Sequence, residues 1–228
     1  MKIIEIKGLE KHYSESELIV KAVDNISFSV QKGEFLVIVG PSGSGKTTLL
    51  NLIGGLDSPT TGEIYVDGFA IHKMKQDQLA DFRLHNIGFV FQNYNLIPVL
   101  TAKENIEMIM KLQGLSKKDC NKRTLDLLDT IGLSARANSK PSKLSGGQQQ
   151  RIAVARSIAA GPKFILADEP TANLDSHSAE ILLDTMQLLN QNEGTTFIFS
   201  THDPRIMKRA KRIIRLEDGK IIDDITNA

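Results

Sequence analysis

Short apolar runs recur along the chain, separated by glycines and polar residues. The continuous runs are predicted to be buried strands, and they lie at residues 35–39, 87–91, 164–167 and 195–201. Such runs are typical of strands that are covered on both faces of a sheet. Residues 2–7 instead alternate apolar and charged side chains, which predicts a strand with one face toward solvent.

The remaining pattern predicts turns, further strands and helices. Extended segments are expected as a pair of strands within 19–30, a strand at 62–68 and a hairpin over 212–223. Helices are expected over residues 76–85, 176–192 and 205–209, and in the middle of the chain over 101–113, 116–131 and 147–160. Thr101 is the predicted N-cap of its helix, because Glu104 follows three residues later and completes a capping box. This alternation predicts an α/β fold with a mostly parallel sheet, helices on both faces and a helical insertion from about 93 to 161.

Composition narrows the class of protein. The 228 residues suffice for one sizeable α/β domain, and the formal net charge of +1 gives no reason to expect nucleic-acid binding through bulk charge. Cys120 is the only cysteine, so no internal disulfide can form and a reducing compartment is expected. No apolar run approaches the roughly 20 residues that span a bilayer, and the N-terminus lacks a signal-peptide pattern. We therefore expect a cytosolic protein, or one that reaches a membrane only through a partner.

The first candidate for chemistry is the stretch from Gly40 to Thr48, which fits the phosphate-loop pattern G-x-x-x-x-G-K-[ST]. Glycines let backbone N–H groups turn toward an anion, and the helix predicted to start near Lys46 directs its positive end to the same place. Lys46 can reach the β- and γ-phosphates of a nucleotide, and the Thr47 hydroxyl can hold Mg²⁺. A chance glycine-rich turn is the alternative. The buried strand before it and the apolar helix after it favour nucleotide binding.

Polar residues that end buried strands are the next candidates. Asp168 follows an apolar strand, where a carboxylate can hold Mg²⁺, and the adjacent Glu169 is placed to polarise an attacking water. Gln92 and His202 each follow another predicted strand, and ligand-contacting residues come from the carboxyl ends of parallel strands. An acidic helix-entry turn and a structural histidine are the alternatives.

The segment Leu144–Gln148 opens a helix with glycines at its mouth, so it offers a second anion-binding helix start. Since one nucleotide already has its phosphate loop, a second such site makes sense if it serves the nucleotide of another subunit. A plain glycine-rich helix start is the alternative. Tyr13 could stack on an adenine ring, or it could be a surface or packing tyrosine.

The ATP-binding cassette (ABC) ATPases carry the same motifs in the same order. This chain resembles them over nearly its whole length, at Gly40–Thr48, Gln92, Leu144–Gln148, Asp168–Glu169, Asn173–Asp175 and His202. The resemblance implies a P-loop NTPase, RecA-like core at residues 1–92 and 162–228 with an N-terminal antiparallel β subdomain. It also implies a helical signature subdomain at 93–161.

The resemblance also assigns roles by position. It implies that the ATP phosphates bind at Gly40, Ser42, Gly43, Ser44, Gly45, Lys46, Thr47 and Thr48, and that Mg²⁺ contacts Thr47, Gln92 and Asp168. Glu169 is implied as the general base, His202 as a γ-phosphate contact and Tyr13 as the adenine-stacking aromatic. The partner's ATP is implied to meet Ser145, Gly146, Gly147 and Gln148, with Asp175 at the dimer seam.

A narrower resemblance points to the lipoprotein-releasing and macrolide-exporting ATPases. It lies in Ile87–Gln92, Asn95–Pro98, Leu100–Asn105, Leu144–Arg151 and Ala167–Asp175, with Ala172 where that group usually has glycine. This implies an ATPase that forms a homodimer around two ATP·Mg²⁺ and drives an integral membrane permease moving lipoproteins, peptides or drugs. It would lie on the cytoplasmic face of the membrane, held there by the permease. An ABC importer ATPase, or a non-transport ABC protein of DNA repair or translation, is the alternative.

Overall fold

A six-stranded sheet forms the centre of the molecule. The computed structural model describes residues 1–15 and 18–226. Within these, the strand order is β10-β9-β3-β8-β7-β6, and every neighbouring pair is parallel except β10 with β9. The strands, in the order of the chain, are β3 (Phe35–Val39), β6 (Ile87–Val90), β7 (Phe164–Asp168), β8 (Thr196–Ser200), β9 (Arg212–Glu217) and β10 (Lys220–Thr226). The predicted mostly parallel sheet is confirmed.

Both faces of this sheet are covered, because alternate residues of each strand enter different hydrophobic clusters. In β3, Leu36 and Ile38 pack with the N-terminal strands and α1, whereas Phe35 and Val37 pack with the helices of the other side. One cluster therefore joins α1 (Lys46–Ile53) and α2 (Gln76–Asn86) to the sheet. The other joins α3 (Ala102–Leu112), α4 (Lys117–Thr130), α5 (Gly146–Ala159), α6 (Ser176–Glu193) and α7 (Pro204–Arg209). Three short 3-10 turns complete the described helices, at Ile71–Lys73, Ser134–Arg136 and Pro141–Lys143.

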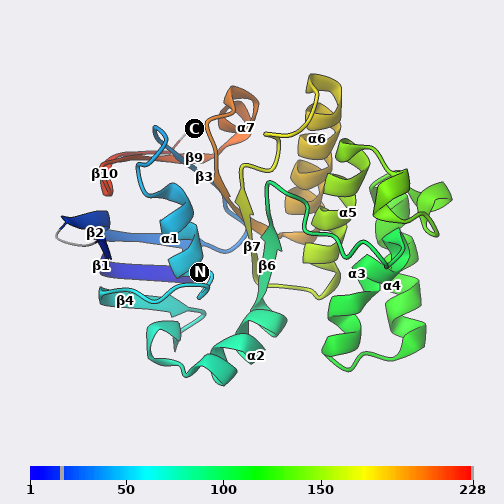
Figure 1. The fold of residues 1–228 in the computed structure, drawn as a ribbon, viewed down its shortest axis with the longest axis horizontal. Helices are drawn as coiled ribbons and strands as arrows, with labels where there is room; N and C mark the ends of the chain where they lie inside the picture. The colour runs from blue at the N-terminus through cyan, green and yellow to red at the C-terminus, as the bar shows by residue number, and fades with distance from the viewer. Residues whose placement is uncertain (16–17, 227–228) are drawn as a thin grey trace.

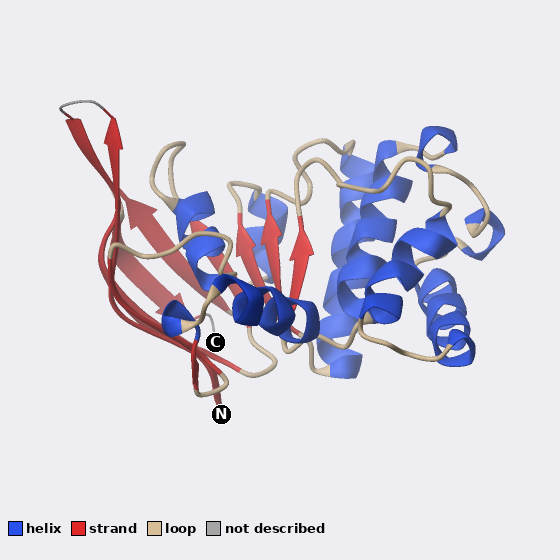
Figure 2. Cartoon of the chain, turned by 60° about the horizontal axis from the view of Figure 1, so that its bottom comes forward, coloured by secondary structure: helices blue, strands red, loops and turns tan. Residues whose placement is uncertain are grey.

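A second, antiparallel sheet covers one end of the molecule, and α3, α4 and α5 lie together at the other (Figures 1 and 2). Its strand order is β2-β1-β4-β5, from β1 (Lys2–Glu15), β2 (Leu18–Gln31), β4 (Thr61–Val66) and β5 (Phe69–Ala70). The parallel strands stand between these two ends (Figure 2).

The prediction for residues 19–30 was wrong, because this segment is one long strand and not a pair. Asn25 is the reason: it adopts a φ of 54°, and β2 carries an extra residue between the pairs Leu9↔Ile26 and Lys11↔Val23. The bulge accommodates this extra residue, so β2 continues through a polar stretch whose sequence is typical of a turn. The first strand likewise continues beyond the predicted residue 7 to Glu15.

The predicted capping box at the start of α3 is confirmed. The Glu104 backbone N–H donates to Thr101 Oγ1 at 3.2 Å, and the Thr101 N–H donates to Glu104 Oε2 at 2.8 Å. Helix α5 begins with the same device, formed by Ser145 and Gln148. No helix among residues 1–15 and 18–226 combines the length and the apolar character that crossing a membrane requires.

Candidate functional site

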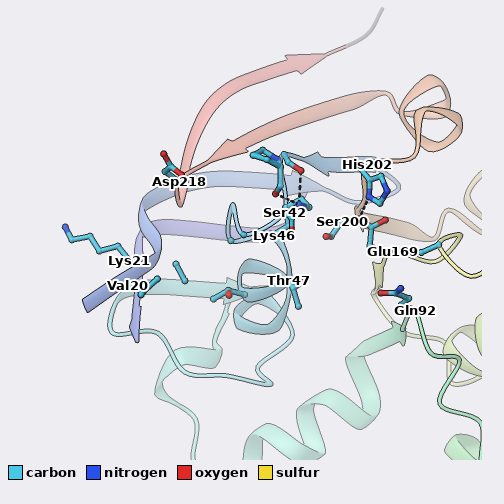
Figure 3. A pocket seen from close by; sticks show the side chains of 17 residues that line it. Val20, Lys21, Ser42, Lys46, Thr47, Gln92, Glu169, Ser200, His202 and Asp218 are labelled. Atoms are coloured by element: carbon cyan, nitrogen blue, oxygen red, sulfur yellow. Dashed lines mark hydrogen bonds and ion pairs between the residues drawn. The ribbon is translucent and has the colours of Figure 1, made fainter. Parts of the chain in front are cut away.

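A cavity of about 750 Å³ lies where the carboxyl ends of β3, β7 and β8 meet. Of the residues predicted for the site, it is lined by Gln92, Glu169, His202 and all of Gly40–Thr48 except Ser44. Figure 3 shows Ser42 and Lys46 in the middle, with Gln92, Glu169 and His202 on one side and Val20, Lys21 and Asp218 on the other. The fold therefore brings together six stretches of chain that are separate in the sequence.

The glycine-rich loop between β3 and α1 has a shape that only glycine permits at two positions. A Cβ at Gly45, whose φ is 97°, would collide with the carbonyl oxygen of Ala22, and a Cβ at Gly40 would collide with that of Leu216. The loop backbone thus packs closely against β2 at Ala22 and against β9 at Leu216. The Lys46 ammonium donates to the carbonyl oxygens of Gly40 and Pro41, both at 2.8 Å, so its charge lies over the loop.

These features fit a bound polyphosphate. Backbone amides of a loop that opens a helix, one ammonium and small residues form an anion cradle. The Ser44 hydroxyl is buried and has no hydrogen-bond partner among the described residues, so it retains an unused donor within the loop. At Gly43 the space where a Cβ would lie is open to 4 Å, which leaves room for an anion.

A hydroxyl and a carboxylate meet beside the loop at the start of α1. Thr47 Oγ1 donates to Asp168 Oδ2 at 3.0 Å, and the Gln92 side chain lines the same cavity. Oxygen ligands of this kind suit Mg²⁺. Within the described residues no group of three or more His, Cys, Asp or Glu side chains could hold a metal by itself. The oxygens of Thr47, Asp168 and Gln92 fit an ion whose other ligands are nucleotide phosphates and water.

Glu169 is held by strained backbone and two side-chain contacts. Its φ of 43° is unusual for a residue other than glycine, and its N–H donates to the Ser200 carbonyl at 2.8 Å. Thr201 Oγ1 donates to one carboxylate oxygen at 2.9 Å, and His202 Nδ1 lies 2.7 Å from the other. The carboxylate is thus fixed at the cavity wall, where it can accept a proton from a bound water.

The buried carboxylate of Asp203 connects the chain segments on either side of the Glu169–His202 contact. Asp203 accepts hydrogen bonds from Thr171 Oγ1 at 2.7 Å and from the Arg205 guanidinium at 2.7 Å, and the Asp203 N–H donates to Thr201 Oγ1 at 3.0 Å. Burial acts to raise the pKa of Asp203, but the hydrogen bonds from Arg205 and Thr171 outweigh it and lower the pKa from 3.8 to about 2. Asp203 therefore ties the segment after Glu169 to the segment that carries His202.

Replacing Asp203 with asparagine is expected to lower the free energy of unfolding at pH 7 by about 2 kcal/mol. Because the carboxyl pKa is depressed in the folded state, its stabilisation is complete above the unfolded pKa near 3.8 and is lost as pH falls through about 2. Urea denaturation should show a difference in the free energy of unfolding between parent and variant that is the same at pH 7 and pH 5 and smaller at pH 3. Asp81→Asn, whose side chain is 75% exposed, is the control and should change stability by less than about 0.5 kcal/mol. A difference that stays unchanged down to pH 3 would exclude this account.

The residues predicted to serve a partner's nucleotide do not line this cavity. Ser145 and Gln148 cap α5, and Asp175 caps α6 by accepting from the Ser178 N–H at 2.9 Å. Gly146 lies against the Tyr94 hydroxyl, and a Cβ at Gly147 would lie 2.6 Å from Ser178 Cβ. The segment Ser145–Gln148 and the start of α6 therefore pack together, apart from the cavity of the same chain.

Tyr13 also lies outside the cavity lining. Its hydroxyl donates to Asp57 Oδ2 at 2.7 Å, and its ring lies under the Lys11 ammonium at 4.9 Å. Burial and the Asp57 carboxylate raise the pKa of Tyr13, while a hydrogen bond with Thr48, which does line the cavity, opposes the rise. Tyr13 thus borders the cavity beside the start of α1.

Several lining residues could not be predicted from motifs. Val20, Lys21 and Ala22 come from β2, Ser200 ends β8, and Asp218 lies in the turn between β9 and β10. None belongs to a recognisable pattern. The positions of Thr201 and Asp203 on either side of His202 were the one available signal for the network around Glu169.

Comparison with known proteins agrees with the motifs. The model of the ABC transporter family matches residues 23–172. The chain is 47% identical over 224 residues to the macrolide export ATP-binding/permease protein MacB of Mannheimia succiniciproducens; these residues are 98% of this chain but 35% of that protein. It is 46% identical to the uncharacterized ABC transporter ATP-binding protein MJ0796 of Methanocaldococcus jannaschii, covering 96% of this chain and 95% of the relative. The chain thus spans about a third of the length of the macrolide exporter it matches.

The solved structures give the same result for the fold. A dimeric structure of MJ0796 in a post-hydrolysis state, bound to ADP and Pi, superposes with a TM-score of 0.90 at 42% identity and covers 98% of both chains. A second dimeric structure of that cassette also has a TM-score of 0.90. The predicted family and its P-loop fold are confirmed. The chain belongs to the ABC transporter family, in which it is an ATP-hydrolysing cassette.

Proposed function

We propose that two copies of this protein close around two ATP·Mg²⁺ and drive export or extraction through an integral membrane permease. The observation that carries this proposal is the division of the site. Phosphate loop and hydrolytic residues line one cavity, whereas Ser145–Gln148 lie outside it with their glycines at the start of a helix. A second copy would complete each site. Two solved structures of one similar cassette, MJ0796, aligned at 42% and 43% identity, are described as dimeric, which supports this arrangement.

Within each site the chain's residues divide the work. The loop Gly40–Thr48 holds the phosphates, with Lys46 on the β- and γ-phosphates, and Tyr13 at the edge of the cavity stacks on adenine. Thr47, Asp168 and Gln92 hold Mg²⁺, which neutralises phosphate charge when it is bound. Glu169 takes a proton from the attacking water, and His202 contacts the γ-phosphate from the adjacent position. The partner's Ser145, Gly146, Gly147 and Gln148 close over the same phosphate, with Asp175 at the seam.

We place the permease contact in an apolar groove of about 420 Å³ next to the helical unit 93–161. Its lining residues include Leu84, Phe89, Phe91, Met108, Ile109 and Arg156. The relatives that are longer than this chain are described as ATP-binding and permease proteins in one chain, so the occupant we propose is a cytoplasmic segment of a permease. One chain segment connects the groove to the cavity, because Phe91 of the groove directly precedes Gln92 of the cavity.

The cargo classes that fit this group are lipoproteins, peptides and drugs, and 47% identity with a macrolide exporter favours export. The protein would lie on the cytoplasmic face of the membrane through its permease, without inserting into lipid and without binding nucleic acid. Import is the second candidate. Identification of the co-purified permease by mass spectrometry separates the two, because exporters and importers have different membrane partners.

Introducing a charge into the groove is expected to release the protein from membranes. Ile109→Asp places a carboxylate where an apolar segment must dock, so membrane-pelleted protein should fall at least about 10-fold. Leu125→Asp, on the 47% exposed α4 position, is the matched control and should pellet like the parent. Fractionation of native membranes measures both. Full retention of the Ile109 variant would rule out the groove, and retention after deletion of the permease gene would indicate direct lipid contact.

A further inference from the structure

The buried amide of Gln150 links α5 to two backbone segments of the hydrolytic site. Gln150 on α5 has no exposed surface, and its Nε2 donates to the carbonyl oxygens of Phe91 at 3.2 Å and Pro170 at 2.9 Å. Phe91 immediately precedes Gln92, and Pro170 immediately follows Glu169. A single side chain therefore bridges the backbones beside Gln92 and Glu169, which lie on the same side of the cavity (Figure 3).

Packing alone does not account for a glutamine at this position. Its Oε1 has no hydrogen-bond partner among the described residues, although leaving a buried carbonyl oxygen without a donor is destabilising. An apolar side chain of similar volume would fill the space without that cost. The reversed amide would set its oxygen against two carbonyl oxygens, so the two N–H groups must be the functional end. We therefore attribute the glutamine at this position to the two hydrogen bonds that its Nε2 donates.

A second contact holds the same segment from the same helix. Arg156, six positions after Gln150, donates to the carbonyl oxygens of Tyr94 at 3.0 Å and Asn95 at 2.5 Å. Tyr94 and Asn95 adopt φ values of 39° and 48°, so this backbone is sharply turned. Arg156 is buried, and this desolvation lowers the pKa of its guanidinium. Helix α5 thus fixes the segment after β6 at both of its ends.

We propose that Gln150 is a positioning residue that sets the separation of Gln92 and Glu169 for hydrolysis. It acts through the carbonyls of Phe91 and Pro170, and it connects them to a helix whose first turn, two residues away, is Ser145–Gln148. Capture of the partner's nucleotide at that first turn would in this way adjust the hydrolytic pair of the same chain. This inference rests on the proposed function, in which Glu169 is the base.

The test replaces the amide with an apolar side chain of similar length. Gln150→Met removes both hydrogen bonds, and a small displacement of a catalytic group typically costs a large factor in rate, so kcat should fall at least about 10-fold. The KM for ATP and the affinity for a fluorescent ATP analogue should stay within about 2-fold, because the phosphate loop is untouched. The melting temperature should fall much less than the loss of two buried hydrogen bonds would suggest. The reason is that the substitution also removes Gln150 Oε1, the buried oxygen that has no hydrogen-bond partner among the described residues.

The matched control is the preceding residue. Gln149 lies on the same helix, but its Nε2 donates to the Leu144 carbonyl at 3.1 Å, away from the cavity, so Gln149→Met should hydrolyse ATP like the parent. If Gln150→Met does not fold, Gln150→Asn replaces it, because an amide shortened by one methylene cannot span both carbonyls. A parent-like kcat, a loss confined to KM, or an equal loss in Gln149→Met would overturn the proposal.

A double variant separates this inference from the proposed function. In the Glu169→Gln background Gln150→Met should lower the residual single-turnover rate by a much smaller factor than in the parent, since the base that Gln150 positions is already gone. If the rate losses of Glu169→Gln and Gln150→Met multiply fully in the double variant, Gln150 does not act through Glu169. This result would overturn the inference and leave the proposed function intact. Parent-like hydrolysis by Glu169→Gln itself would overturn the proposed role of Glu169.

Discussion

Replacement of Glu169 with glutamine is expected to lower ATP hydrolysis about 100-fold or more while ATP binding survives. The magnitude is that of general-base catalysis. Glutamine keeps the shape of the side chain, and its oxygen can still accept the hydrogen bond from Thr201 Oγ1, but it cannot take a proton from water. Lys46, Thr47 and the loop amides are unchanged, so the phosphates remain held.

The same variant should trap the closed dimer. An uncleaved γ-phosphate continues to engage the partner's Ser145 and Gly147, and loss of the Glu169 charge removes repulsion against the triphosphate. Glu169→Gln is therefore expected to elute as a dimer with ATP and as a monomer with ADP in size-exclusion chromatography.

Adding Ser145→Arg to Glu169→Gln tests whether the site is shared. The arginine puts bulk where the partner's phosphate must lie, so the ATP-dependent dimer should disappear. A phosphate-release assay gives the hydrolysis rate of each variant. A Glu169→Gln protein that hydrolyses ATP at the parent rate would exclude this base, and a dimer that tolerates Ser145→Arg would exclude the shared site.

Replacement of Lys46 with alanine is expected to weaken ATP binding about 10- to 100-fold. The ammonium is the charge that lies over the phosphate loop, where it donates to the Gly40 and Pro41 carbonyls, and a hydrogen bond to a charged group contributes about 1.5–3 kcal/mol. The fold should survive, because the side chain is not part of either hydrophobic cluster. Titration with a fluorescent ATP analogue measures the affinity.

Lys21 provides the matched control for this prediction. It lines the same cavity from β2, but its side chain is 56% exposed, and its ammonium lies 3.7 Å from the Asp24 carboxylate. Lys21→Ala should therefore change the affinity less than about 3-fold, because exposed charges are screened by water and salt. Equal losses for both variants would mean that general charge in the cavity, and not the ammonium of the phosphate loop, holds the nucleotide.

The local features of this protein could be predicted from the sequence because they depend on short stretches of chain. The phosphate loop follows from glycines at fixed spacing, and the start of α3 follows from Thr101 and Glu104, whose side chains and backbone satisfy one another within one turn. Buried strands such as β3 and β7 follow from continuous apolar runs. Hydrophobic periodicity records which faces are buried, so elements and their order were predictable.

The contacts between distant segments required the tertiary structure. Nothing local distinguishes a bulge at Asn25 from a turn, because the choice depends on how β2 pairs with β1. Nor does any motif place Val20 and Asp218 beside the phosphate loop, or the Gln150 amide against carbonyls that lie 59 and 20 positions away in the chain. The sequence shows which residues lie at the end of a predicted strand or in a given turn of a helix. Strand register, the packing of helices and the choice of rotamer decide which of those residues meet, and these are properties of the whole fold.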